Sequence, residues 1–527
     1  MHAALPFLLA MIAAIVLLRM LATRIKIAYP ILLVIAGLAV SFIPALPSVK
    51  IQPDLIFFVF LPPLLFEASW TISYKEMKKW WRIITSFAFL VVFFTAFSVA
   101  IVTNHFIPGF SIAIGFLLGG IVSPPDAVST GAITQFVKIP KSTATILEGE
   151  SLLNDASSLI IFRFAMVAIG TGQLVWQQVA LSFLWMVIGG AIIGLSLAWL
   201  FVQLHKRLPT DAPSDIAFTL IEPYIMYWLA ETLHSSGVLA VVAGGLYMSM
   251  HRLMFLNSAS RIRGFSVWES FVFLLNGIVF FLIGLQLPEI VGSLREEGVP
   301  LSTAIGYGLL VTAVLIVTRI ISSYSALIAT LIFRPKVAPR ADSVKMRWRL
   351  PLLLGWTGMR GVVSLAAALA IPVTLDNGDA FPQRNLILFI TFEAILLTLL
   401  IQGLTLPYLI KRSGLFDTSR YQHKEEEMRL KMKKELKEHV HQFLKAKYEH
   451  ELQGHQGMEK FIQQWEERAK ATDDAWMNDK TKSIFVELLE SQRGYLTELN
   501  KDPNFDEEII RQQLYQIDLE EERLKII

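Results

Sequence analysis

Ser123-Pro124-Pro125-Asp126 interrupts a run of residues that otherwise has the composition of a membrane-spanning helix. Two successive prolines remove two backbone N–H donors and clash with the preceding turn, so the helix is expected to unwind here. Unwound backbone at membrane depth is tolerated only where it lines a cavity or is buried in protein. An aspartate in hydrocarbon is costly unless it faces a partner or water. The stretch therefore predicts an ion site near the bilayer midplane, and the alternative is a kinked helix in which Ser123 and Asp126 only repair the backbone.

A second polar cluster, Glu150-Ser151-Leu152-Leu153-Asn154-Asp155, lies in the next apolar run. Helical spacing places Ser151, Asn154 and Asp155 on adjoining faces of one helix. A hydroxyl, an amide carbonyl and a carboxylate are hard oxygen ligands, which suit a hard cation such as Na⁺ and suit a soft metal poorly. A carboxyl group among such ligands can exchange a bound proton for a cation. We therefore predict that Asp155 is the shared site of the cation and the proton.

The composition separates a membrane domain from a charged tail. The chain has 527 residues, of which 54% are hydrophobic and 17% charged, whereas a soluble protein carries about 25% charged residues. Residues 1–410 form apolar runs of roughly 20 residues, the length that crosses the hydrocarbon core. We therefore expect an all-α polytopic membrane domain over 1–410 and a helical cytosolic domain over 411–527. The absence of cysteine excludes disulfides and cysteine metal sites.

The tail has charged residues among apolar ones at helical spacing, so several amphipathic helices are expected, with breaks at Gly454, Gly457 and Pro503. Its basic start can contact anionic lipid headgroups. Two interpretations remain open for this region. It is either a solvated helical linker or a domain that regulates the protein or stabilises a dimer.

About thirteen spans are predicted, and the ninth is short. Their approximate limits are 3–22, 28–46, 53–72, 83–103, 109–135, 143–169, 175–204, 214–233, 237–250, 266–288, 301–332, 350–373 and 384–410. With the N-terminus outside, only Lys50, Arg295 and Arg384 fall in outer loops, and the many other loop lysines and arginines fall inside. Cytoplasmic loops carry such an excess of Lys and Arg. The sequence therefore predicts an outer N-terminus and a cytoplasmic C-terminus.

Arg360 lies deep in a predicted span, between glycines in residues 355–361. The small residues permit close helix approach, or an unwound stretch that matches the one at Asp126. Glu150 lies just over one turn before Asp155, where two unpaired carboxylates would repel each other. We therefore predict a structural ion pair between Glu150 and Arg360.

Other charged residues within the spans leave alternatives open. Glu67 follows a second double proline, and it either belongs to the ion site or pairs with Arg319 or Arg163. Glu231 and Glu269 are each a lining residue of an inner funnel, a solvated residue at a helix end or the partner of an arginine. Charged groups at membrane depth mark functional sites often enough that all of these residues are candidates.

Three motifs, at residues 123–127, 150–156 and 358–364, resemble those of sodium/proton exchangers of the first cation:proton antiporter class, of the bacterial and archaeal type. Residues 61–67 and 230–237, and Glu269 with Gly284, fit the same family. The resemblance extends over essentially all of residues 1–410.

The resemblance implies roles for individual residues. Asp126 and Asp155 would contact the cation, Ser151 would assist and Asn154 would support the site. Glu67 would lie near the cation, and Glu150 would pair with Arg360.

The resemblance also implies a fold and a stoichiometry. The fold would contain two inverted repeats with broken, crossing helices, and a separate bundle would form a homodimer. An asparagine before the essential aspartate is typical of the electroneutral branch, which exchanges one proton for one cation. Pro125 is a departure from relatives that have threonine at this position. A proline side chain has no oxygen, so this residue can coordinate an ion only through its backbone carbonyl. The preference between Na⁺ and K⁺ is therefore left open.

We therefore expect a secondary antiporter of the cell membrane that exchanges Na⁺, or alternatively Li⁺ or K⁺, for H⁺ by alternating access and serves pH homeostasis. A potassium-selective proton antiporter of the same fold is the alternative, and a cation channel is less favoured because no repeated filter loop is present. An intramembrane aspartyl protease is disfavoured because Asp126 and Asp155 lack the expected flanking sequences. We expect no enzyme activity, no cofactor and no nucleic-acid partner. The expected partners are the transported Na⁺ and H⁺, membrane lipid and a second copy of the chain.

Overall fold

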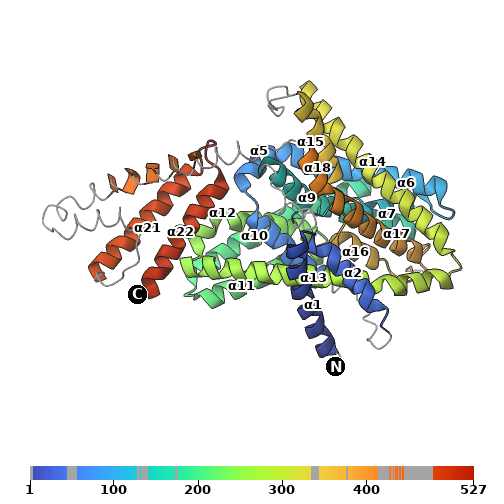
Figure 1. The fold of residues 1–527 in the computed structure, drawn as a ribbon, viewed down its shortest axis with the longest axis horizontal. Helices are drawn as coiled ribbons and strands as arrows, with labels where there is room; N and C mark the ends of the chain where they lie inside the picture. Colours follow the sequence, from blue (N-terminus) through green and yellow to red (C-terminus); the bar gives the residue numbers. More distant parts are fainter. Residues whose placement is uncertain are drawn as a thin grey trace. The chain divides into compact units, whose positions relative to one another are not determined.

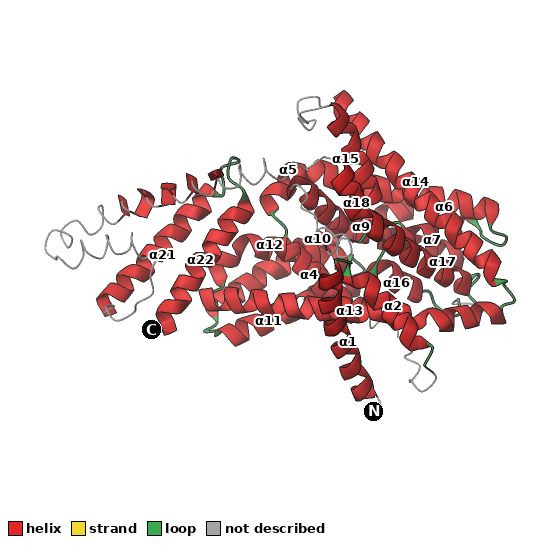
Figure 2. Ribbon diagram, viewed as in Figure 1, coloured by secondary structure: helices red, strands yellow, loops and turns green. Residues whose placement is uncertain are grey.

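The computed structural model consists of helices joined by short connections (Figures 1 and 2). It describes residues 4–43, 56–126, 131, 141–171, 176–333, 344–375, 378–413 and 479–526, with short helical pieces between 427 and 443. In this part of the chain, β-structure is limited to one isolated bridge between Thr374 and Ala380. The all-α prediction is therefore confirmed.

Long helices alternate with shorter ones along the chain. The first part contains α1 (Ala4–Ile25), α2 (Tyr29–Ser41), the π-helical segment η1 (Ile56–Phe60), α4 (Leu61–Thr71), α5 (Tyr74–Thr85), the π-helical segment η2 (Ser86–Val91), α6 (Val92–Phe106), α7 (Ile112–Val122), α9 (Lys141–Thr171) and α10 (Trp176–Arg207). The second part contains α11 (Ala212–Thr232), α12 (Gly237–Phe255), α13 (Ser258–Glu296), α14 (Leu301–Phe333), α15 (Val344–Trp356), α16 (Val362–Leu369), α17 (Arg384–Leu397), the π-helical segment η3 (Thr398–Gln402), α18 (Gly403–Ser413), α21 (Asp479–Leu499) and α22 (Glu507–Ile526).

Among the described residues, eight helical segments are long and apolar enough to cross a membrane, and three shorter helices are also apolar. Large apolar side chains point outward from them, such as Leu17 at 64% exposed and Leu181 at 72% exposed. Helices satisfy their own backbone hydrogen bonds, so they can present this apolar surface to lipid. Some predicted spans consist of consecutive shorter segments, such as α17, η3 and α18, and the count of thirteen stays a prediction.

Two spans are interrupted where the sequence predicts it. α7 ends at Val122, and residues 123–126 are not helical. α15 ends at Trp356 and α16 begins at Val362, so residues 357–361 form a second unwound stretch. The double proline at 62–63 acts differently, because it lies directly after η1 in the first turn of α4, and the helix continues from Phe57 to Thr71 without an unwound stretch.

Glycines bring neighbouring helices close together. A Cβ atom on Gly194 of α10 would lie 2.0 Å from the carbonyl oxygen of Ala240 in α12. A Cβ atom on Gly119 of α7 would lie 2.5 Å from the carbonyl oxygen of Ala96 in α6. Small residues allow this approach, which drives helix association in membranes. α7 also packs against α9, and α12 packs against α4 as well as α10, so two groups of helices share the core (Figure 1).

Residues Thr210–Ile216 and Leu256–Ser266 and the described parts of Asp417–Ile527 form a second compact unit. In this unit α21 packs against α22, and Pro503 lies in the turn between them, as predicted. Gly454 and Gly457 lie outside the described residues. The second unit therefore takes in two segments that precede the predicted boundary at residue 411.

A buried ion network holds this unit together. The carboxylate of Asp518 on α22 accepts hydrogen bonds from Arg493 Nη2 of α21 at 3.0 Å and from Arg261 Nη2 at the start of α13 at 2.5 Å. All three side chains are at most 11% exposed. Glu521 also contacts Arg493 and the hydroxyl of Ser258. The network ties α21 and α22 to the first turn of α13.

Candidate ion-binding site

The two unwound stretches meet at Asp126. The backbone N–H of Asp126 donates a hydrogen bond to the carbonyl oxygen of Met359, 2.7 Å away. A Cβ atom on Gly361 would lie 2.3 Å from Asp126 Oδ2, so only glycine leaves room for the carboxylate at this position. The double proline opens one helix and the glycines open the other. The carboxylate of Asp126 is thereby placed at the crossing of two broken helices, the arrangement that inverted-repeat transporters use for their ion sites.

Helix α9 is fixed against this crossing by serine hydroxyls. Ser158 donates to the carbonyl oxygen of Gly120 in α7 at 2.6 Å, and Ser157 donates to the carbonyl oxygen of Ala88 in η2 at 2.5 Å. The two serines follow Asp155 by two and three residues in the sequence. The rotation of α9 about its axis is therefore set, with Asp155 close to the crossing.

Asn154 contacts the unwound stretch directly. Its Nδ2 donates to the carbonyl oxygen of Pro125 at 3.3 Å, and the residue is fully buried. Its Oδ1 has no hydrogen-bond partner among the described residues. The structure thus brings Asn154 to the position expected of a supporting residue. It also shows that the carbonyl of Pro125, the one oxygen that this residue has, points toward Asn154.

Asp155 is 8% exposed and lies close enough to Asp126 for their charges to interact. Ser151 lies one helical turn before Asp155, on the same side of α9. Two carboxylates, a hydroxyl and the carbonyl of Pro125 are the hard oxygen donors that the region offers to a monovalent cation. Among the described residues, no group of three or more His, Cys, Asp and Glu side chains forms a metal site. The two carboxylates, the hydroxyl and the carbonyl together have the chemistry that suits a monovalent cargo cation.

The predicted ion pair between Glu150 and Arg360 is wrong. Both carboxylate oxygens of Glu150 accept hydrogen bonds from Arg319 of α14, at 2.6 and 2.9 Å. The Glu150 and Arg319 side chains are 1% and 3% exposed, so the pair is fully buried. Arg319 was considered as a partner for Glu67, and the structure assigns it to Glu150 instead. The sequence shows that several arginines need partners, but not which one the helix packing turns toward Glu150.

Arg360 donates hydrogen bonds to the backbone of the two broken helices. Its Nε donates to the carbonyl oxygen of Val122 at 2.6 Å, and its Nη1 donates to the carbonyl oxygen of Gly358. Its backbone N–H donates to Thr398 Oγ1 at 3.1 Å. Unwinding leaves such carbonyl groups without intrahelical donors, and a guanidinium group offers several donors in a fixed geometry. Arg360 therefore links the end of α7 to the unwound stretch before α16.

Glu67 of α4 lies near two other carboxylates, and its place in the ion site stays a prediction. It is close enough to Glu148 and Glu269 for their charges to interact. Tyr29 of α2 is close enough to both Asp126 and Glu67 to sense their charges. Glu148 was missed by the sequence reasoning. Its spacing of seven residues from Asp155, which places both on the same face of a helix, is a signal that could have identified it.

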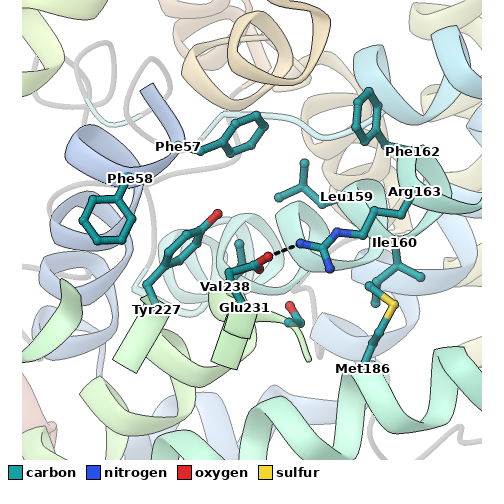
Figure 3. Close-up of a pocket in the computed structure, with 11 residues that line it drawn as sticks. Phe57, Phe58, Leu159, Ile160, Phe162, Arg163, Met186, Tyr227, Glu231 and Val238 are labelled. Atoms are coloured by element: carbon teal, nitrogen blue, oxygen red, sulfur yellow. Dashed lines mark hydrogen bonds and ion pairs between the residues drawn. The ribbon is translucent and has the colours of Figure 1, made fainter. Parts of the chain in front are cut away.

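Glu231 is the partner of an arginine, one of the alternatives considered for it. Its Oε2 forms an ion pair with Nη2 of Arg163 on α9, and its Oε1 accepts a hydrogen bond from the backbone N–H of Gly237 at 3.0 Å. Figure 3 shows this pair at the wall of a cavity, with Phe57, Phe58 and Tyr227 around it. The pair is separate from the crossing at Asp126.

A buried histidine pairs with another membrane carboxylate. Glu222 Oε1 lies 2.9 Å from Nε2 of His205, and both side chains are at most 2% exposed. This contact joins α10 to α11 at the end of α10 that carries Lys206 and Arg207. The sequence pattern gave no sign of it, because the two residues are separated by a loop.

The chain is similar to known membrane transporters. The family model of the sodium/hydrogen exchanger transmembrane region matches residues 9–412. The Na⁺/H⁺ exchanger Rv2287 of Mycobacterium tuberculosis is 29% identical, over 98% of this chain and 95% of its own length. The sodium, potassium, lithium and rubidium/H⁺ antiporter of Bacillus subtilis is 32% identical, over 72% of this chain and 57% of its own length.

The fold is also found in a solved structure. The sodium proton antiporter MjNhaP1 from Methanocaldococcus jannaschii matches 78% of this chain and 99% of its own, with a TM-score of 0.61 at 19% identity. Two broken helices that cross at an aspartate, an Asn-Asp pair on the adjacent helix and a match over most of the chain lead to one conclusion. The chain belongs to the sodium/hydrogen exchanger family of membrane transporters.

Proposed function

We propose that this chain is a secondary active antiporter that exchanges Na⁺ for H⁺, with Asp155 and Asp126 holding the cargo. One observation carries the proposal. The two unwound stretches meet where Asp126 lies against Gly361, and Asn154 on α9 binds the carbonyl of Pro125 beside them. Such a site is buried, rich in oxygen and built from helices that can shift as bodies.

The five charged side chains at and beside the crossing support an exchange of one for one. Glu150, Asp126 and Asp155 carry three negative charges when ionised, and Arg319 and Arg360 carry two positive charges. The sum of three negative and two positive charges is one net negative charge. One Na⁺ or one H⁺ offsets this charge, and the neighbouring Asn154 adds none. The cycle proposed is therefore electroneutral, with the two cargo ions excluding each other from Asp155.

Alternating access requires one group of helices to move against another. α7, α9 and α16 carry the residues of the crossing or pack against it, whereas α4, α10 and α12 pack on each other. We propose that the first group moves relative to the second during transport. The unwound stretches travel with it, because Arg360 and Asn154 hold them together.

A potassium-selective antiporter of the same fold is the second candidate. The name of the Bacillus subtilis relative includes K⁺, Li⁺ and Rb⁺ as well as Na⁺. Pro125 offers only its carbonyl oxygen, which is already held by Asn154, so the site has few fixed ligands with which to select by size. Li⁺ and K⁺ are therefore included in the test as alternative cargo.

We further propose that the protein is a homodimer in the cell membrane, in contact with lipid, with its N-terminus outside and its C-terminus in the cytoplasm. The outward-facing apolar side chains of α10, such as Trp185 and Trp199 at 54% and 55% exposed, support a surface that faces lipid or a second copy. The Lys and Arg residues of the loops support the orientation.

The test is proton movement in proteoliposomes after pulses of Na⁺, Li⁺ or K⁺. Asp155→Asn is the matched control, because asparagine keeps the volume of the aspartate side chain and removes its titrating charge. A saturable proton efflux that depends on the cation and is lost in Asp155→Asn is expected. A cation flux that moves no protons would contradict antiport and indicate a channel. Proton flux driven by K⁺ alone would support the potassium antiporter.

A further inference from the structure

A cavity of about 310 Å³ lies between α9 and the helices α10, α11 and α12 (Figure 3). Its wall includes residues near the end of α11 and the start of α12, on the side that the loop charges assign to the outside. Phe58, at 41% exposed, lies at its rim. The cavity therefore reaches into the protein from the side that carries the junction of α11 and α12.

Arg163 and Glu231 form an ion pair in the wall of this cavity. Arg163 Nη2 contacts Glu231 Oε2, and the side chains are 40% and 28% exposed. Glu231 is also held by the first residue of α12, because its Oε1 accepts the N–H of Gly237. One partner thus belongs to α9 and the other to the junction of α11 and α12.

Arg163 lies directly above the ion site along α9. It follows Asp155 by eight residues, which corresponds to about 12 Å of helix. Leu159 lies one turn from each of them, on the same side of α9, and it lines the cavity, whereas Asp155 does not. A cation that enters from this side therefore meets the arginine first, then Leu159 and only then Asp155.

The pair joins two groups of helices that must separate if the site is to open outward. α9 packs chiefly on α7 and is held to it by Ser158, whereas Glu231 is anchored on the side of α10 to α12. A partly exposed ion pair contributes little free energy, so it can break within a transport cycle. The fully buried pair of Glu150 and Arg319 cannot break so easily, because each charge would be stranded.

We propose that the Arg163–Glu231 pair is the outer gate of the exchange pathway. When formed, it holds α9 against the junction of α11 and α12 and places a positive charge across the route of the cation. When broken, it lets the cavity extend past Leu159 to Asp155. This inference rests on the proposed antiport function, because it assigns a step of that cycle to the pair.

The test uses the absence of cysteine in the chain, since any introduced cysteine is the only thiol. Leu159→Cys reports on the route below the pair, and Phe58→Cys reports on the rim. Each is combined with Glu231→Gln, which keeps an oxygen for the N–H of Gly237, or with Arg163→Gln. The full-length protein in right-side-out vesicles is labelled from outside with a membrane-impermeant maleimide, and sodium-driven proton flux is measured in parallel.

Labelling at Leu159→Cys should rise roughly two- to five-fold in both glutamine variants, because that is the change in population that loss of a partly exposed ion pair causes. Labelling at Phe58→Cys should not change. Glu289→Gln, an exposed carboxylate on the same side, is the matched control and should change neither. The exchanged pair Arg163→Glu with Glu231→Arg should return labelling at Leu159→Cys toward the starting rate.

Two results would overturn the gate. Unchanged labelling at Leu159→Cys in both glutamine variants would remove it, and so would an equal rise at Phe58→Cys, which would indicate general loosening. If sodium-driven proton flux persists in either case, the antiport proposal stands without the gate. An absence of flux in the unmodified protein would overturn the antiport itself, whatever the labelling shows.

Discussion

The buried pair of Glu150 and Arg319 allows a quantitative test of how the core is assembled. Two hydrogen bonds of 2.6 and 2.9 Å join side chains that are 1% and 3% exposed. Removal of either partner strands a charge in the core, which costs about 3–5 kcal/mol. Replacement of both by neutral residues of similar volume strands none. Glu150→Gln and Arg319→Gln should therefore each destabilise the protein strongly, and the double variant should lose no more than either single one.

The assay is thermal unfolding in detergent, with Arg360→Gln as the comparison. Arg360 is just as buried, but it donates to the carbonyl groups of Val122 and Gly358 rather than to Glu150. The Glu150 and Arg319 variants should show a large interaction energy in a double-mutant cycle. The Glu150 and Arg360 variants should come much closer to additivity. Additive losses for Glu150 with Arg319, or a larger interaction for Glu150 with Arg360, would refute the assignment of partners.

Three further predictions concern the crossing, the stoichiometry and the tail. Gly361→Ala should weaken the apparent cation affinity, measured as proteoliposome flux, at least about tenfold, because the new Cβ atom would displace the carboxylate of Asp126. Gly306→Ala is the control and should not change the affinity, because a Cβ atom there meets no atom within 4 Å. Asn154→Asp adds a second acid, so its transport rate should respond to an imposed membrane potential; an unchanged rate would contradict the charge count. Asp518→Asn leaves the two buried arginines Arg261 and Arg493 with fewer carboxylate partners. Limited proteolysis should therefore cut the tail faster while the membrane domain stays intact. An unchanged digestion pattern would contradict the network.

The features that the sequence predicted well depend on local chemistry. Pro124 and Pro125 cannot continue a helix, so the end of α7 at Val122 follows from the residues themselves. The glycines at 358 and 361 allowed either close helix approach or a second unwound stretch, and the structure shows the unwound stretch. Pro503 predicted the turn between α21 and α22. The polar cluster of Ser151, Asn154 and Asp155 on α9 was recognisable from its spacing alone, and its role in holding the cation stays a prediction.

The features that the sequence missed depend on how distant helices face each other. Whether Glu150 meets Arg319 or Arg360 depends on the rotation of α14, which no local pattern reveals. Arg163 and Glu231 are separated by 68 residues, and their contact exists only because α9 passes the junction of α11 and α12. In each case the sequence indicated that a buried charge needs a partner, and only the packing of the helices shows which one.

The central claim is that one proton and one cation compete for the carboxyl group of Asp155. The most direct measurement is the sodium dependence of proton flux in proteoliposomes at several pH values, with the membrane potential first clamped and then left free. Below the pKa of the site, the apparent affinity for Na⁺ should fall about tenfold for each unit of pH, because each bound proton excludes one cation. The rate should be the same at zero and at imposed potential. An affinity that does not change between about pH 6 and pH 8, or a rate that depends strongly on the potential, would contradict competition at a single carboxyl group.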